Sequence, residues 1–361
     1  MKRIKDPIHN YILLEDFFVR LVDTQQMQRL RFIKQLGTAN LVYPGANHTR
    51  FEHSLGTYNL AKSFSEALGI EHREEFMAAA LLHDIGHGPF SHVSDSIASK
   101  HGLDHIKRTC DAVKKSELHD VLDSAGLNAS RVVELIKGRP PRGCLLSGSI
   151  DVDRLDYLMR DSYYTGANFG YIDLGRLFSG ASVSRNRIVV DESCVATVES
   201  ILVFRSLMYP TVYYHHTVRI AGVMLEKAIE GEIEKGSMDV EEMMGMDDVS
   251  LVSLLRSERN RMWGGIESRD LYKTICEFPY QGGSIEQIKD LGDDVIVDVI
   301  EPPIWREMEV NVLTGHGLRK IVDVSTLAKS LLSAQRDHYR VAVYAPKERR
   351  EEVERAVRGI I

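Results

Sequence analysis

The stretch HDIGHGPFSH, residues 83–92, decides how this sequence is interpreted. It follows the apolar segment Ala78–Leu82, so the adjacent His83 and Asp84 emerge from a segment predicted to be a buried helix. Burying polar groups without partners is costly, and a bound metal would satisfy both side chains. The structural alternative is a hydrogen-bonded core histidine beside an aspartate that ends the helix.

Two further stretches combine histidine, aspartate and arginine: RFEHSLG at residues 50–56 and IDVDRLDYLMRD at residues 150–161. His53 lies at the start of a predicted helix. In the second stretch, a helical period of 100° per residue separates an apolar face from a polar one. The polar face is predicted to carry Asp153, Tyr157, Arg160 and Asp161. A solvated helix face explains this pattern as well as a phosphate and metal site does.

Taken together, the stretches supply two imidazoles, His53 and His83, and two carboxylates, Asp84 and Asp153. This mixed nitrogen and oxygen set suits Mn²⁺, Fe, Co²⁺, Ni²⁺ or Zn²⁺, and Mg²⁺ suits an oxygen-rich second position. A metal held in this way polarises a phosphoryl group and lowers the pKa of bound water to about 7, so no Ser or Cys nucleophile is needed. The candidates to neutralise phosphate charge or to protonate the leaving oxygen are Arg50, His87, His92, His105 and Arg154.

Helical periodicity dominates from Val22 to Ile136 and predicts a mainly α protein built on a helical bundle. Thr24 is expected to cap a helix whose apolar residues recur every third position up to Leu36, before Gly37 stops it. Further helices are predicted along 55–68, 76–82, 151–162 and 199–235, with a loop at 137–143 and a hairpin at 183–190.

The composition changes near Gly282, where residues 295–300 and 308–312 are predicted as strands. A turn at 315–317, a helix capped by Ser325, a strand at 340–344 and a final helix from Pro346 complete a small α+β region. The expected division is therefore residues 1–281 as the helical domain and residues 282–361 as the C-terminal α+β region.

Charge and composition limit the classes of function. The chain has 361 residues, 43% of them hydrophobic, and a net charge of −7, which argues against nucleic acid and anionic lipid as partners. The four cysteines form no C-x-x-C pair, and no apolar run approaches the length of a membrane span. The sequence therefore predicts a cytoplasmic protein without a membrane anchor.

These stretches resemble the HD phosphohydrolase superfamily, specifically the branch with the animal dNTP triphosphohydrolase that carries a sterile alpha motif and its prokaryotic relatives. Besides residues 83–92 and the helix from Asp151, the match includes DPIH at 6–9, DTQQMQRLRFIKQLG at 23–37 and YPGANHTRFEH at 43–53. The resemblance implies an HD-type helical bundle, a divalent metal, a nucleotide substrate and a homo-oligomer.

By position, the resemblance implies the metal ligands His53, His83, Asp84 and Asp153, rather than Asp151. It assigns phosphate contacts to Arg50, Arg154 and Tyr157, and proton transfer to His92 with His87 and His105 nearby. The implied sugar and base contacts are Gln35, Leu36, Asp161 and Tyr214, and the implied regulatory-nucleotide contacts are Asp23, Gln28 and Arg31. Arg154, Thr217 and Lys5 depart from the family's Lys, Lys and Asn, which changes the expected phosphate grip and regulation.

The expected activity is hydrolysis of a deoxynucleoside triphosphate to deoxynucleoside and tripolyphosphate. The alternatives are a phosphatase or phosphodiesterase for nucleoside monophosphates or cyclic nucleotides, and a non-catalytic nucleotide-binding regulator. Product identity separates the two enzymes, and binding without turnover would favour the regulator. The sequence leaves the preferred base, the native metal and the number of subunits open.

Overall fold

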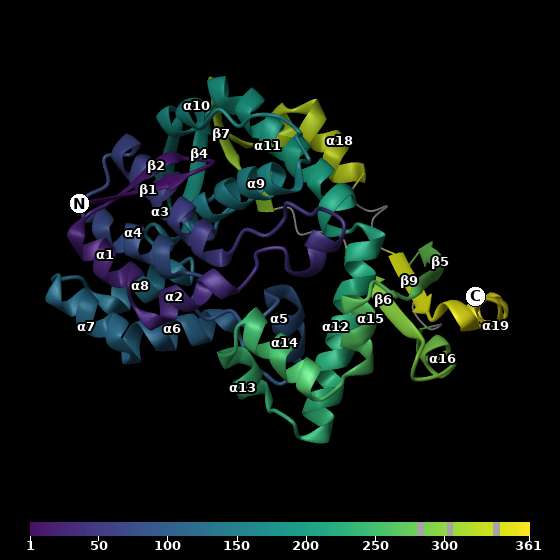
Figure 1. The fold of residues 1–361 in the computed structure, drawn as a ribbon. Helices are drawn as coiled ribbons and strands as arrows, with labels where there is room; N and C mark the ends of the chain where they lie inside the picture. The colour runs from purple at the N-terminus through teal and green to yellow at the C-terminus, as the bar shows by residue number, and fades with distance from the viewer. Residues whose placement is uncertain (280–284, 302–305, 335–339) are drawn as a thin grey trace.

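The computed structural model describes residues 1–279, 285–301, 306–334 and 340–361. It confirms a mainly helical protein with a small α+β part towards the C-terminus (Figure 1). The helices of the first part are α1 (Asp16–Val22), α2 (Gln25–Arg29), α3 (Arg50–Ala67), α4 (Arg73–Leu82), α5 (Ser91–Lys100), α6 (His105–Lys115), α7 (Glu117–Ser124), α8 (Ala129–Ile136), α9 (Val152–Thr165), α10 (Leu174–Ser179), α11 (Val195–Met208) and α12 (His216–Lys235).

The later helices are short: α13 (Val240–Gly245), α14 (Asp248–Ser257), α15 (Arg261–Glu267), α16 (Ile285–Lys289), α17 (Ile321–Val324), α18 (Thr326–Ala334) and α19 (Arg350–Arg358). The strands form a hairpin of β1 (Lys2–Asp6) and β2 (Asn10–Leu14), a sheet of β3 (Ala181–Ser184), β4 (Arg187–Asp191), β7 (Asn311–Thr314) and β8 (Gly317–Lys320), and a sheet in the order β5 (Lys273–Pro279), β9 (Arg340–Ala345), β6 (Ile296–Ile300).

Helices α3, α4 and α9 pack together and position the predicted ligands. Thr49 and Glu52 form a capping box that fixes the first turn of α3. His53 lies about one turn after the cap. The apolar residues of α4 from Phe76 to Leu82 are all buried, so His83 and Asp84 leave the end of a core helix as predicted. The three helices thus present their polar residues at one place.

The helix predicted from Thr24 to Leu36 is wrong beyond residue 29. α2 ends at Arg29, a 3-10 turn covers Leu30–Phe32, and Ile33 is extended. The reason is tertiary, because the Ile33 carbonyl accepts from the Arg50 amide and the Gln35 amide donates to the His48 carbonyl. The apolar spacing correctly indicated burial of this segment, but the backbone pairs with the residues before α3 instead of continuing a helix.

The predicted hairpin at 183–190 is confirmed as β3–β4, with positive φ at Arg185 and Asn186 in its turn. The strand predicted from Met308 begins only at Asn311, because Arg306–Glu309 is a 3-10 turn. The predicted boundary after residue 281 lies outside the described residues. Strands from both sides of it share sheets, since β5 pairs with β9 and β4 pairs in parallel with β7.

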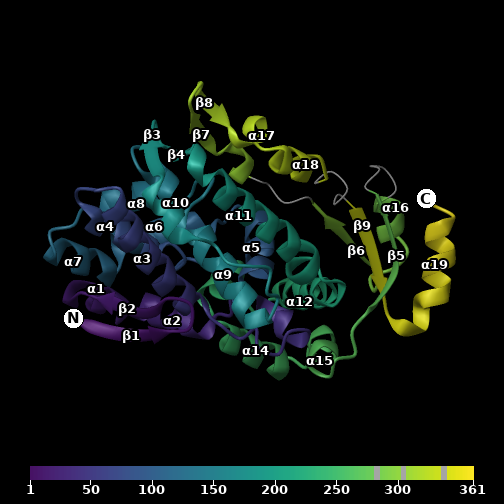
Figure 2. The same cartoon turned by 90° about the horizontal axis from the view of Figure 1, so that it is seen from above.

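Two large apolar cores lie side by side. The first packs the bundle around α3, α4, α8, α9 and α11, and the second packs α5 and α12–α15 against β6 and β9. Figures 1 and 2 show α12 between the bundle and the sheet of β5, β9 and β6. Among the described helices, none combines the length and the apolar character needed to cross a membrane.

Candidate functional site

A cavity of about 810 Å³ lies at the junction of the two cores. Its walls come from α3, residues 83–96, α9, α12 and β6. Most of the residues predicted from the sequence line it, although they come from distant parts of the chain: Gln35, Leu36, Arg50, His53, His83, Asp84, His87, His92, His105, Asp153, Arg154, Tyr157, Asp161 and Tyr214.

Three of the four predicted metal ligands, His53, His83 and Asp84, bring their donor atoms close enough together to hold a metal ion, and Asp153 lies beside the two imidazoles. His53 Nε2 lies 3.0 Å from Asp153 Oδ1 and 3.8 Å from Asp84 Oδ2. His83 Nε2 lies 3.3 Å from Asp84 Oδ1 and 3.6 Å from Asp153 Oδ1. Ligand atoms about 2.1 Å from a first-row metal lie roughly 3 to 3.5 Å from one another, so these separations fit a shared divalent cation.

The hydrogen bonds of both imidazoles leave one nitrogen aimed at this group. His83 Nδ1 lies 2.8 Å from the Ala80 carbonyl, and its buried Nε2 has no hydrogen-bond partner among the described residues. His53 Nδ1 lies 2.8 Å from Asp156 Oδ2. Because a carbonyl and a carboxylate accept, each Nδ1 carries a proton and each Nε2 is the nitrogen left to face a cation; that of His53 lies 3.0 Å from Asp153 Oδ1 and would give up its proton when a cation binds. The residues therefore fit a divalent metal.

The pKa values of His53 and Asp84 are shifted by their charged neighbours. Burial lowers the pKa of His53, but its hydrogen bonds to Asp153 and Asp156 outweigh burial and raise that pKa to about 10. Burial raises the pKa of Asp84, but Arg50 and His83 hold it well below its ordinary value. Metal binding to such a group releases protons, so affinity rises with pH.

Asp151 and Asp153 face different ways, as predicted. Asp151 caps α9, where its carboxylate accepts from the amides of Arg154 and Gly148 at 2.8 and 2.9 Å. Asp153, two residues later, faces His53 and His83. The predicted reason, a helical step of about 200°, does not apply, because Asp151 is the N-cap in extended backbone and α9 begins only at Val152; its hydrogen bonds to the first turn are what turn its carboxylate away from the imidazoles.

The two arginines predicted to contact phosphate, Arg50 and Arg154, make contacts that the sequence did not predict. Arg50 Nη1 donates to Asp84 Oδ2 at 2.5 Å, and its Nε donates to Ser91. Arg154 Nη1 donates to the carbonyls of Gly148 and Ser149 at 3.0 and 2.9 Å. Both guanidinium groups are thus fixed by the protein at the rim of the predicted metal site, and their phosphate contacts remain predictions.

A second group of imidazoles surrounds Asp95. His87 Nδ1 and His105 Nδ1 lie 2.8 and 3.3 Å from Asp95 Oδ2, and the two rings stack with centroids 4.0 Å apart. His92 is exposed to the open cavity. The cavity walls desolvate its ring and the Arg50 guanidinium repels a positive charge there, which lowers the pKa of His92 to about 4.

At another part of the cavity are the side chains predicted to read sugar and base. Gln35 Oε1 is buried without a hydrogen-bond partner in the described part of the chain, and Leu36 is 9% exposed. Asp161 accepts from His48 and Tyr213, both at 2.8 Å. The Tyr214 hydroxyl donates to the Glu301 carbonyl at 2.7 Å. The neighbouring Tyr213 was not among the predicted residues.

Comparison with known proteins identifies the family. A model described as HD domain matches residues 50–161, and one described as HD associated region matches residues 172–291 and 288–361. The chain belongs to the HD-domain family. An uncharacterized protein of Methanocaldococcus jannaschii is 35% identical over 98% of this chain and 81% of its own length.

Two further similar proteins are named for an activity. The deoxynucleoside triphosphate triphosphohydrolase SAMHD1 of Gallus gallus is 29% identical over 77% of this chain, but the alignment spans only 56% of that protein. A phosphohydrolase from Bacteroides thetaiotaomicron has a solved structure that matches 96% of this chain and 100% of its own, with a TM-score of 0.79 and 26% identity. The HD-domain chain thus shares its fold with a phosphohydrolase.

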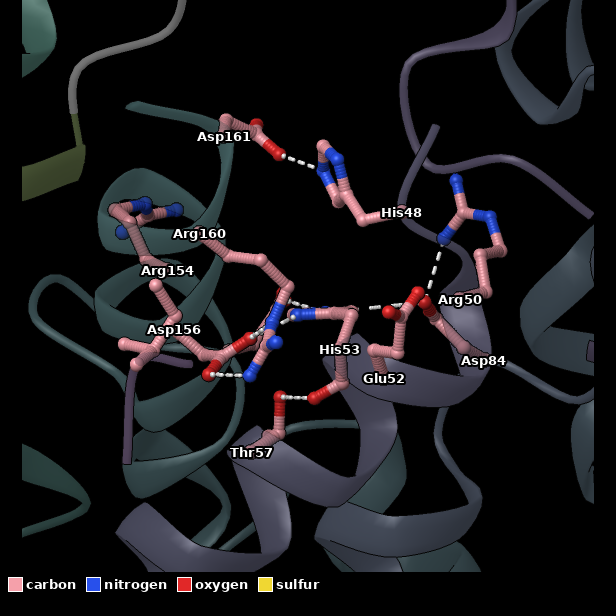
Figure 3. A network of polar contacts seen from close by, with 12 residues as sticks. His48, Arg50, Glu52, His53, Thr57, Asp84, Arg154, Asp156, Arg160 and Asp161 are labelled. Carbon is pink, nitrogen blue, oxygen red and sulfur yellow. Dashed lines mark hydrogen bonds and ion pairs between the residues drawn. The ribbon is translucent and has the colours of Figure 1, made fainter. Parts of the chain in front are cut away.

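Sequence reasoning missed the polar groups behind the predicted ligands. Arg160, predicted to lie on the polar face of its helix with Asp153, is fully buried and pairs with Asp6. Figure 3 shows its ion pair with Asp156. Asp156 also contacts His9 and His53. The only available signal was the DPIH stretch at residues 6–9, which the resemblance covered without assigning it a role.

The predicted regulatory residues lie outside the cavity lining of this HD domain. Arg31 is exposed; it donates to Gln28 Oε1 at 2.8 Å and lies over the Phe51 ring. Asp23 is exposed at the C-terminal end of α1. The first contact holds Gln28 and Arg31 together, and nucleotide binding at these residues remains a prediction.

Proposed function

We propose that this HD-domain protein is a metal-dependent hydrolase that converts deoxynucleoside triphosphates to deoxynucleosides and tripolyphosphate. The observation that carries the proposal is that the predicted metal ligands share one cavity with Arg50, Arg154, Gln35 and Leu36. The cavity therefore combines groups suited to phosphates with groups suited to a sugar. Its volume of about 810 Å³ is within the usual range for ligand pockets, about 300–1,000 Å³.

A divalent metal at His53, His83, Asp84 and Asp153 would polarise the phosphoryl group and lower the pKa of bound water. The chain's own residues would hold the substrate around it. Tyr157 and Arg154 line the cavity one turn apart on α9, where they are suited to contact phosphate oxygens.

His92 is the proposed proton donor. Water oxygen attacks the α-phosphorus and gives up a proton to solvent, the bond from that phosphorus to the 5′ oxygen breaks, and the 5′ oxygen takes a proton from the His92 imidazolium, which then regains one from solvent. In the ligand-free protein the pKa of His92 is lowered to about 4 by the cavity walls and by Arg50. A triphosphate beside the ring would raise it, because negative charge stabilises the imidazolium.

Sugar selection would depend on Gln35 and Leu36. The unpartnered Gln35 Oε1 can accept from a 3′-hydroxyl. An apolar Leu36 side chain offers no partner to a 2′-hydroxyl, which would favour deoxyribose. The named activity of the Gallus gallus relative supports this substrate class, and the Bacteroides structure supports phosphoester hydrolysis more broadly.

The test is incubation of the protein with each dNTP and Mn²⁺, Mg²⁺, Fe²⁺, Co²⁺ or Ni²⁺, followed by chromatography of the products. We expect deoxynucleoside and tripolyphosphate in equal amounts. Orthophosphate, or turnover of nucleoside monophosphates or cyclic nucleotides alone, would instead identify a phosphatase or phosphodiesterase. Saturable dNTP binding without turnover under any metal would identify a nucleotide-binding regulator.

A further inference from the structure

The N-terminal hairpin contacts the residue that holds a predicted metal ligand. We propose that Asp156, held by His9 and Arg160, positions His53 for metal binding, so that the β1–β2 hairpin is part of the metal centre. This inference rests on the proposed metal site but not on the identity of the substrate. Asp156 is thus a positioning residue, since it acts on the metal through His53.

The carboxylate of Asp156 is fully buried and every acceptor position on it is used. Oδ2 lies 2.8 Å from His53 Nδ1 and accepts from Arg160 Nε at 2.9 Å. Oδ1 lies 2.6 Å from His9 Nε2 and accepts from Arg160 Nη2 at 3.0 Å. A carboxylate offers about four lone-pair sites, so this one has no freedom to turn away from His53.

The hairpin reaches this carboxylate through its turn. Asp6, the last residue of β1, accepts from the amides of Ile8 and His9 at 2.9 and 2.8 Å. The other oxygen of Asp6 accepts from Arg160 Nη1 at 2.9 Å. Asp6 thus fixes the turn that directs His9 towards Asp156. Asp6 also forms an ion pair with the Arg160 guanidinium, which is bound to Asp156 as well. Buried ion pairs therefore connect the hairpin to α9.

Gly56 provides independent evidence that α3 is built around this group. A Cβ atom at residue 56 would come within 1.9 Å of Asp156 Oδ1 and 2.4 Å of Arg160 Nη2. These contacts are too short for any side chain. A glycine one turn after His53 therefore makes room for the Asp156–Arg160 ion pair. The close approach lets α9 support a ligand on α3 from behind (Figure 3).

The physical effect is on the proton and the orientation of His53. A carboxylate at Nδ1 keeps the proton there, leaves the lone pair on Nε2 and makes that nitrogen a stronger ligand. Loss of such a partner typically weakens metal binding about 10- to 100-fold. Because His9 shares the carboxylate, displacement of the hairpin would weaken the hold on His53 as well.

The first experiment measures Mn²⁺ affinity by competition with a chelator for wild type, Asp156→Asn and Glu232→Gln. Glu232 is the matched control, because it is also fully buried and hydrogen bonded. It lies on α12 and accepts from Lys235, Ser237 and Asn260. We expect Asp156→Asn to bind Mn²⁺ about 10- to 100-fold more weakly and Glu232→Gln to bind it as wild type does.

The second experiment uses His9→Ala, which removes the hairpin's contact and leaves three donors on Asp156. We expect a smaller loss of Mn²⁺ affinity than for Asp156→Asn, and a shift of the ligand-field absorption of the Co²⁺-loaded protein, which a change confined to folding stability would not produce. Circular dichroism shows whether each variant folds; if Asp156→Asn does not, His9→Ala decides.

Wild-type affinity and spectrum in folded His9→Ala and, where it folds, in Asp156→Asn would overturn the inference and leave the proposed function standing. Failure of wild type to bind any divalent metal would overturn the metal site itself, and with it the proposed hydrolase. The two failures are therefore distinguishable.

Discussion

The cavity contains two groups of histidines that differ in the partners of their nitrogen atoms. His53 and His83 each have Nδ1 fixed by an acceptor behind the cavity wall, and both aim Nε2 at Asp84 and Asp153. In the other group, His87 and His105 share the single carboxylate of Asp95, and His92 faces open space.

The difference separates two kinds of chemistry. Imidazoles held at Nδ1 from behind, with Nε2 facing carboxylates, are organised for a cation. In the second group His87 is buried and His105 is partly exposed around Asp95, and the exposed His92 is the imidazole placed to exchange a proton with a ligand or solvent. His83 and His87 lie only four residues apart in the sequence, so the separate tasks proposed for the two groups rest on their geometry.

The largest expected effect is on the first group. Asp153→Ala removes a predicted ligand, so both the polarisation of phosphate and the activation of water are lost, and kcat should fall by about 10⁴-fold or more. Asp151→Ala, which removes only a helix cap, should retain far more activity and its metal. Metal content by mass spectrometry and kcat on a dNTP check this; equal metal loss in the two variants would contradict the assignment.

His92→Ala tests the second group. Because His92 is the proposed acid and contacts no predicted ligand, the variant should keep its metal while kcat falls by about 10²- to 10³-fold. The same two measurements apply, and they separate the groups directly. If His92→Ala loses metal as Asp153→Ala does, the distinction between the two groups fails.

The pH behaviour of His92 sharpens the comparison further. The pKa of its imidazole is lowered from 6.5 to about 4 by desolvation and by Arg50, so the ring is neutral at pH 7 in the free protein. Between those values the unfolded chain binds a proton that the folded chain does not, so this group lowers stability as the pH falls. Nuclear magnetic resonance titration should show a transition near pH 4 that moves upward with a non-hydrolysable dNTP analogue. An unchanged transition would argue against a phosphate beside His92.

The smallest expected effect lies outside both groups. Leu36→Ala should relax discrimination between dGTP and GTP, because a single pocket wall contributes about 10- to 200-fold to such a ratio. Gln35→Ala is the matched comparison, since losing a contact to the 3′-hydroxyl should weaken both nucleotides alike. The measurement is the ratio of kcat/KM for the two substrates. A folded Leu36→Ala protein with the wild-type ratio would make Leu36 a packing residue.

The sequence predicted what depends on local pattern. His83 and Asp84 leave an apolar helix, a feature that could be predicted from periodicity, whereas Asp151 proved to be the N-cap of α9 rather than a residue within the predicted helix. Ile33 shows the limit of that reading: its spacing correctly indicated burial, yet hydrogen bonds to residues 48–50 replaced the helix.

The support behind the site could not be predicted in the same way. Asp156 and Arg160 are separated by one helical turn, which equally describes an exposed ion pair on a helix surface. Their burial depends on Asp6, 154 residues earlier in the chain than Arg160, and on the bare surface at Gly56. Only the packing of α3, α9 and the hairpin converts this pair into part of a site.

The parallel pairing of β4 with β7 has a consequence for how the chain folds. Residues 189–191 pair with residues 311–313, so one sheet cannot be completed until the ribosome has made most of the protein. Until then β4 would expose an unpaired edge of amides and carbonyls, which is a surface for association with other chains. Pairing of strands so far apart in the sequence is slow relative to helix formation, so we expect the helical bundle to form before β7 pairs with β4.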